Sequence, residues 1–211
     1  MNLIYTLLTD GSSDKTLIPI INWTLEQIPD IRFVSQYAEQ SLPPSAGLFQ
    51  RAAAAIQFYE CDILLVHRDA ESLAVNLRIA EIRADLIELG KPYVPIVPIH
   101  MTEAWLLIDE QAIRAAASNP NGTIELCIPR ANRLENISDP KNVLFEKLKL
   151  ASELPSRRLN KFRPESRRHR VAELISDFSQ LRNLSAFVQF EEELTKCVQT
   201  LKGVAALNIK Q

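Results

Sequence analysis

Short apolar runs alternate with amphipathic segments over the first hundred residues of the chain. The apolar runs have the length and composition of β-strands, and they cover residues 3–9, 31–37, 62–67 and 93–99. The segments between them carry apolar residues at helical spacing, over 15–27, 46–59 and 72–89. This βαβαβαβ order predicts an α/β fold with a doubly wound, Toprim/Rossmann-like parallel sheet.

The connections between these elements restrict the order of the strands. Right-handed crossovers and short connections favour the order 2-1-3-4. The first and third strands are then neighbours, and ligands bind in such sheets where the carboxyl ends of neighbouring strands form a crevice. Polar residues in 31–37 predict an exposed edge strand, and Pro92, Pro95 and Pro98 place the fourth strand at an edge or a bulge.

Beyond His100 the pattern becomes mainly helical. A helix is expected to begin with Thr102 as its N-cap, and 118–133 has the composition of a loop. Further helices are expected over 141–151, 166–177 and 184–201. The chain is therefore divided into an α/β domain over 1–117 and a mainly helical C-terminal lobe over 118–211, which we expect to pack together as one compact unit.

Composition narrows the functional classes. The chain has 211 residues, of which 46% are hydrophobic and 24% charged, as in a packed globular protein. Its net charge of −2 provides no overall field toward nucleic acid, so any basic site must be local. Three isolated cysteines and three scattered histidines argue against a structural zinc site. The first apolar run is too short for a signal peptide or a membrane span, so we expect a cytoplasmic protein that does not associate with membranes.

Acidic residues follow three of the predicted strands. Asp10, Asp69, Glu71 and Glu103 each come just after an apolar run, and Asp14 lies one turn beyond Asp10. Taken singly, each is more often structural, because Asp-Gly is an ordinary turn pair and an acid is common in the first turn of a helix. Gathered at one sheet edge, however, like charges repel unless a cation lies among them.

Oxygen ligands of this kind suit a hard divalent cation. Magnesium usually takes one or two carboxylates together with water and substrate phosphates. The sequence therefore predicts that Mg²⁺ or Mn²⁺ is bound by Asp10, Asp69, Glu71 and Glu103.

Several motifs resemble a known superfamily. The run DGSSD at 10–14 resembles the E-G-x-x-D opening of the Toprim (topoisomerase–primase) superfamily, with Asp10 in the position of the glutamate. The run RDAE at 68–71 resembles its D-x-D motif, with Asp69 first and Glu71 replacing the second aspartate. Three further runs resemble the small stand-alone Toprim-like proteins of the domain of unknown function 4276 family: IHMTEAWLLID at 99–109, ISDPKNVL at 137–144 and RHRVAELI at 168–175.

The resemblance implies a magnesium-dependent Toprim fold, with nucleases, primases and topoisomerases as relatives. It implies catalytic roles for Asp10, as the general acid/base, and for Asp69 and Glu71, as the metal-binding pair. Both replacements keep the charge and move the carboxylate by one methylene. The expected activity is phosphodiester hydrolysis or phosphotransfer on DNA or RNA by a Toprim-type nuclease. The resemblance also implies bacterial phage defence and a partner ATPase.

Two rival functions stay open. One is a non-enzymatic Toprim-like binding or regulatory subunit. The other is a receiver-like protein with Asp69 as the phosphoacceptor, which would need a fifth strand carrying a lysine, and no such strand is predicted.

A basic run at 157–170 is the only concentrated supply of cations in the chain. Such a run is typical either of a solvated helical face or of a phosphate-binding rim. For the second case we expect the lobe to fold over the carboxyl edge of the sheet. The predicted substrate-binding residues are Asp14, Lys15, Arg68, His100, Arg163, Arg167 and Arg168. His67 is interpreted as the end of a strand and Trp105 as part of the core.

Overall fold

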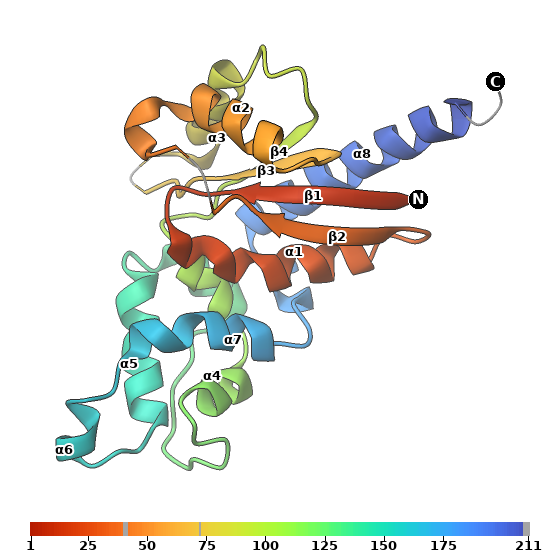
Figure 1. Cartoon of the computed structure of the whole chain (residues 1–211). Coiled ribbons are helices and arrows are strands. Elements are labelled where there is room, and N and C mark those ends of the chain that lie inside the picture. Colours follow the sequence, from red (N-terminus) through yellow and green to blue (C-terminus); the bar gives the residue numbers. More distant parts are fainter. Residues whose placement is uncertain (40–41, 72, 209–211) are drawn as a thin grey trace.

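The structure, a computed structural model, describes residues 1–39, 42–71 and 73–208. It contains one four-stranded sheet in the order β2-β1-β3-β4, in which every pair is parallel (Figure 1). The strands are β1 (Asn2–Leu8), β2 (Arg32–Tyr37), β3 (Ile63–His67) and β4 (Tyr93–Ile96). The predicted α/β class, parallel sheet and strand order are confirmed.

The register of the central strands aligns their carboxyl ends. Leu8 of β1 pairs with Val66 of β3, so the turns that follow both strands leave the sheet side by side. All five residues of β3 are buried, because this strand has a neighbour on each side and helices on both faces. β2 and β4 are the two edge strands, as their polar residues and prolines predict.

Helices cover both faces of the sheet (Figure 1). Tyr5 and Leu7 of β1 pack in one core cluster with α1 (Leu17–Glu26), which follows a short 3-10 turn, η1 (Ser12–Thr16). Leu64 and Val66 of β3 face the opposite side and pack with α2 (Leu48–Phe58) and α3 (Val75–Asp85). A short 3-10 turn, η2 (Pro44–Ala46), precedes α2. The period-2 alternation of β-strand side chains thus divides the core into two layers.

The second half of the chain is mainly helical. Before residue 118 lie η3 (Thr102–Leu106) and α4 (Glu110–Ala116). The elements of the lobe are η4 (Ala131–Asn136), α5 (Pro140–Ala151), α6 (Ser156–Leu159), η5 (Pro164–Arg167), α7 (Arg168–Leu174), η6 (Ser179–Asn183) and α8 (Ser185–Asn208). Trp105 is fully buried, and the centroid of its ring lies 5.5 Å from that of Phe187 and 6.3 Å from that of Phe190. These rings belong to the same core cluster as Tyr5 and Leu7, so lobe and sheet share one core.

Some element boundaries differ from the sequence-based expectation. The helix expected over 72–89 is shorter, from Val75 to Asp85, and Ser72 lies outside the described residues. The expected cap at Thr102 is wrong: Met101 is the N-cap of the 3-10 turn η3, and the Thr102 hydroxyl contacts the ring of His67 instead. α4 packs against α5 and α7 although it precedes residue 118, so its contacts are with the lobe.

No helix among the described residues is both long enough and apolar enough to cross a membrane.

Candidate functional site

A small polar cavity lies where β1 and β3 end. Its volume is about 120 Å³. The residues that line it are Asp10, Asp14, His67, Arg68, Asp69, Glu71 and Arg78. The parallel register accounts for this gathering, because the turns after β1 and β3 leave the sheet at adjacent positions.

His67 lines this cavity, although its side chain is only 2% exposed. Its Nδ1 is 3.0 Å from the carbonyl oxygen of Ile96, and because a carbonyl can only accept, Nδ1 carries the proton. In the neutral ring, Nε2 then presents a lone pair. Nε2 is 3.3 Å from the Thr102 hydroxyl, 3.6 Å from Asp69 Oδ1 and 3.9 Å from Asp14 Oδ2. The Thr102 hydroxyl can donate to this lone pair, and the two carboxylates beside it make a cation favourable at the same place.

Asp69 carries the most perturbed charge of the site. Its pKa is raised to about 6, first because the carboxyl is buried, and further by the negative charges of Asp14 and Glu103. The ring of His67 and the backbone N–H of Thr102 act in the opposite direction. Asp69 Oδ1 is buried and accepts no hydrogen bond from any residue that the structure describes. A buried carboxylate oxygen without a donor is a place where a cation is favourable.

Asp10 is held by two arginines. Its Oδ1 accepts from Nη1 of Arg51, and its Oδ2 is 3.3 Å from Nε of Arg68. Arg51 also donates to the carbonyls of Thr9 and Leu42, which ties α2 to the end of β1. Asp10 is therefore fixed in place with positive charge on both oxygens.

The other two predicted metal ligands are also paired with arginine. Glu71 is 73% exposed and lies 3.8 Å from Arg78 Nη2, at a left-handed φ of 54°. Glu103 is buried and accepts from Arg168 Nη1. It does not line the cavity, but its charge contributes to the raised pKa of Asp69.

Only some of the predicted substrate-binding residues meet here. Asp14 and Arg68 line the cavity. Lys15 lines a neighbouring cavity of about 290 Å³ that shares Asp10, and there it pairs with Glu39 and lies over the Tyr37 ring. His100 does not line either of these two cavities.

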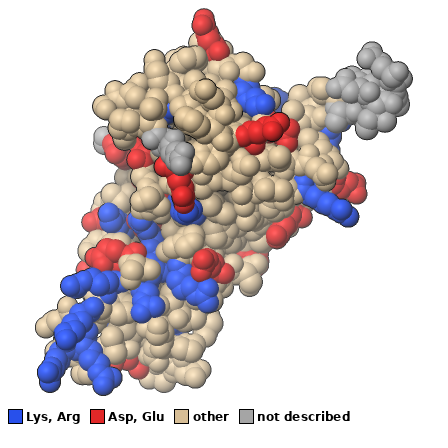
Figure 2. All heavy atoms as spheres, in the orientation of Figure 1, with Lys and Arg blue, Asp and Glu red and all other residues tan. Residues whose placement is uncertain are grey.

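The predicted basic run is divided between two environments. α7 packs against η1 at the carboxyl end of the sheet, and its first residue, Arg168, reaches Glu103. Arg167 lies over the Phe162 ring, and Arg163 donates to the carbonyl of Asn160. Figure 2 shows Lys and Arg gathered on the lower end of the molecule, the region that Figure 1 assigns to α5 and α6.

The acidic side chains of the site are not arranged around a common metal position. No three His, Cys, Asp or Glu side chains among the described residues are placed to hold a metal together. The donor set nevertheless suits a hard cation, because no described residue donates to Asp69 Oδ1 and Asp14 Oδ2 approaches the same imidazole nitrogen. These side chains would have to rotate to enclose a cation.

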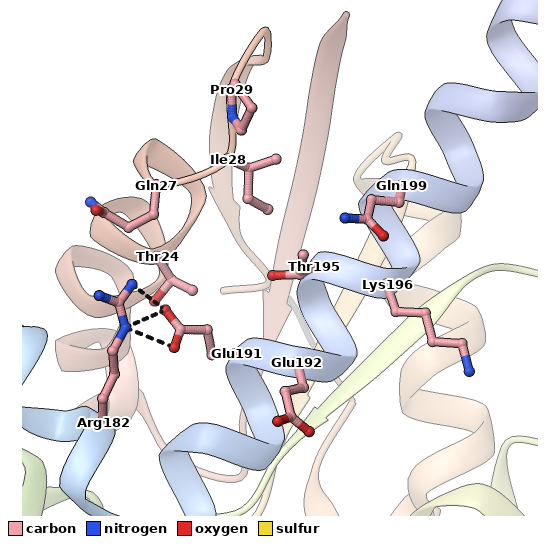
Figure 3. Close-up of a pocket in the computed structure, with 10 residues that line it drawn as sticks. All are labelled: Thr24, Gln27, Ile28, Pro29, Arg182, Glu191, Glu192, Thr195, Lys196 and Gln199. Carbon is pink, nitrogen blue, oxygen red and sulfur yellow. Dashed lines mark hydrogen bonds and ion pairs between the residues drawn. The ribbon is translucent and has the colours of Figure 1, made fainter.

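A larger cavity of about 460 Å³ lies elsewhere, between the end of α1 and α8 (Figure 3). Among the lining residues drawn in Figure 3, Arg182 and Glu191 form the one charged pair, and several hydrogen bonds join them. It lacks the uncompensated buried carboxylate of the small cavity. Size alone therefore does not identify the site.

Sequence patterns missed four contributors, namely His67, Thr102, Arg51 and Arg78. The position of His67 directly before Arg68 and Asp69 was a usable signal, since the end of a strand faces the crevice. The two arginines lie on α2 and α3, where helical periodicity treats a charged residue as solvent-facing. Both are buried instead.

Comparisons of the chain with known protein families, with curated proteins and with solved structures found no match.

Proposed function

We propose that the chain is a metal-dependent phosphodiester-hydrolysing or phosphotransfer enzyme of the Toprim type, acting on nucleic acid. The observation that carries the proposal is the convergence of Asp69 Oδ1, Asp14 Oδ2 and His67 Nε2, with no donor to Asp69 Oδ1 among the described residues. This arrangement favours a bound cation, and the motifs at 10–14 and 68–71 favour magnesium or manganese.

The residues of the site have distinct roles in this proposal. Asp69 and Asp14 hold the cation, and Glu71 enters the set by turning away from Arg78. Asp10, whose side chain is 42% exposed, has two parts: it joins the cation's ligands through Oδ2, and it acts as the general acid/base toward water. Arg68 contacts a substrate phosphate, for which its planar fork of donors is suited. When bound, magnesium would polarise a phosphate oxygen and lower the pKa of an attacking water.

One observation favours the non-enzymatic alternative. Asp10, Glu71 and Glu103 each have an arginine close by, so the protein itself supplies positive charge beside three of the four predicted ligands. A subunit that keeps the fold and binds a partner without catalysis needs no metal to compensate these acids. Phage defence with a partner ATPase remains part of both proposals.

The test compares cleavage by the parent protein and by Asp69→Asn. Single-stranded DNA, duplex DNA and structured RNA are incubated with each protein in Mn²⁺ and in EDTA. The enzyme proposal expects cleavage by the parent in Mn²⁺ alone, and none by Asp69→Asn. Asp177→Asn is the matched control, because Asp177 is an exposed acid that binds Ser179. Full activity of Asp69→Asn would contradict the role of Asp69 in holding the cation, and no cleavage of any substrate would favour the binding subunit.

A further inference from the structure

The four arginines around the site differ in how firmly they are held. Arg51 has a side chain only 4% exposed and makes three hydrogen bonds, and Arg78 is 11% exposed and bonded to Glu81 and the Asp69 carbonyl. Arg168 is 13% exposed and pairs with buried Glu103. The Arg68 side chain is 31% exposed, and its guanidinium makes one contact with the residues that the structure describes, of 3.3 Å through Nε. Arg68 is therefore the arginine that can move at least energetic cost.

The contact with Arg68 occupies the second carboxylate oxygen of Asp10. Arg51 occupies Oδ1 from a buried position, and Arg68 occupies Oδ2 from the cavity wall. A cation beside Oδ2 would meet the positive charge of Arg68 at close range. While Arg68 stays in this position, Asp10 is blocked as a metal ligand.

A phosphate group is a better partner for Arg68 than its present one. The guanidinium can donate two parallel hydrogen bonds to a phosphate, whereas its contact with Asp10 uses Nε alone. No partner for its Nη atoms is seen within the described part of the chain. The donors needed for a phosphate are thus available at the cavity.

We infer that Arg68 exchanges Asp10 for a phosphate group of the substrate, and that this exchange frees Asp10 Oδ2 for the metal ion. The inference rests on the proposed function and adds how the binding of the substrate phosphate and of the metal ion are linked. Phosphate and divalent cation then bind cooperatively. A phosphate draws Arg68 away from Asp10 and so removes the positive charge that repels the cation, and a cation at Asp10 in turn releases Arg68 for the phosphate. Arg68 is a positioning residue in this scheme, since it acts on the metal through Asp10.

The coupling must be reciprocal, so it can be measured from the side of the metal alone. Mn²⁺ affinity is determined by electron paramagnetic resonance of the free ion, which requires no turnover. The probes are two short single-stranded oligonucleotides of one sequence: one has charged phosphorothioate links that resist cleavage, and the other has uncharged methylphosphonate links. For the parent we expect Mn²⁺ to bind about tenfold more tightly with the charged oligonucleotide, within the usual range of coupling.

Two variants make the test specific. Arg68→Gln should bind Mn²⁺ several-fold more tightly than the parent without any oligonucleotide, and should lose most of the tenfold enhancement. Arg182→Gln is the matched control, because Arg182 also pairs with a carboxylate, Glu191, but lies in the other cavity, and it should behave as the parent does.

Other outcomes overturn the inference in separable ways. If the parent binds Mn²⁺ equally well with both oligonucleotides, or if Arg68→Gln keeps the enhancement, Arg68 does not couple the two ligands, and cleavage by the parent would still support the proposed function. If the parent binds no Mn²⁺ with either oligonucleotide, the inference fails together with the metal site on which it rests.

Discussion

His67 Nε2 lies 3.6 Å from Asp69 Oδ1, at the point where β3 leaves the core for the cavity. His67 is the last residue of β3, and Asp69 follows two residues later in the segment that leaves the strand. Because Nδ1 of His67 faces the Ile96 carbonyl, only Nε2 is left to face the acids. Backbone pairing between β3 and β4 thus sets the chemistry of the site through one imidazole ring.

The buried charge of Asp69 should make the metal-free protein less stable as pH rises. Its pKa of about 6 in the fold lies above the usual aspartate value of 3.8, so the folded state holds this proton more tightly than the unfolded chain does. Between about pH 4 and pH 6 the folded state therefore binds more protons, and the free energy of unfolding falls as pH rises through that window. Above about pH 6 the full penalty of the buried charge is present.

Asp69→Asn removes this penalty. In EDTA at pH 7.5 the variant should be more stable than the parent by about 2 kcal/mol, with little difference near pH 4.5. Urea unfolding at both pH values measures this. Asp177→Asn should change the free energy of unfolding at pH 7.5 in the opposite direction. Hydrogen bonds from Ser179 lower the pKa of Asp177, so its charged form stabilises the fold and the substitution removes that stabilisation. A parent and an Asp69→Asn variant with parallel pH profiles would contradict the prediction.

The pair of Arg168 and Glu103 should be sensitive to loss of one partner. Glu103 is 4% exposed, so Arg168→Gln would leave a buried carboxylate without its counter-charge. We expect a loss of about 3 kcal/mol in the free energy of unfolding. Arg170→Gln, two residues further along α7, removes an exposed pair with Glu173 and should change stability by less than about 1 kcal/mol. Thermal and urea unfolding of both variants make the comparison, and equal losses would contradict it.

The sequence predicted the parts of the molecule that depend on local pattern. Strand order and the meeting of Asp10 with Asp69 follow from apolar runs and crossover rules, which act over short stretches. The arginine contacts could not be predicted in the same way. Arg51 reaches Asp10 across 41 residues, and Arg168 reaches Glu103 across 65, so each pair depends on how helices pack and not on spacing in the chain. For the same reason, sequence reasoning placed four acids in one metal shell and did not see that arginines lie beside three of them.

Lobe and sheet should unfold together, because Trp105 belongs to the core cluster that also contains Tyr5 of the sheet. Trp105→Leu should lower the free energy of unfolding by about 3 kcal/mol. It leaves Trp23, which packs against Phe178, as the single tryptophan and fluorescent reporter. Fluorescence and far-UV circular dichroism should give one coincident transition. Ile87→Ala, at a site 80% exposed, is the control and should have little effect. Two separate transitions would show that the parts before and after residue 118 are independent domains.

The basic run should contribute unequally to nucleic-acid binding. Arg168 is paired with buried Glu103 and has little freedom to meet a phosphate. Arg163 is exposed and Arg167 only partly buried, and they lie at the two ends of the short segment that leads into α7. α7 itself packs against η1, beside the cavity, which brings this segment toward the carboxyl edge of the sheet. Replacing Arg163 and Arg167 together by Gln should weaken binding of a labelled oligonucleotide.

Each lost phosphate contact should flatten the dependence of log affinity on log salt concentration by about one unit of slope. Fluorescence anisotropy over a range of salt concentrations measures both slope and affinity. Arg157 and Arg158 are the matched control, because they are exposed on α6 within the same basic run. Their double Gln variant removes the same charge from the protein, so it corrects for long-range electrostatics. If both double variants change the slope equally, the run acts as a diffuse charged surface; if neither changes it, the run is only a solvated face of the lobe.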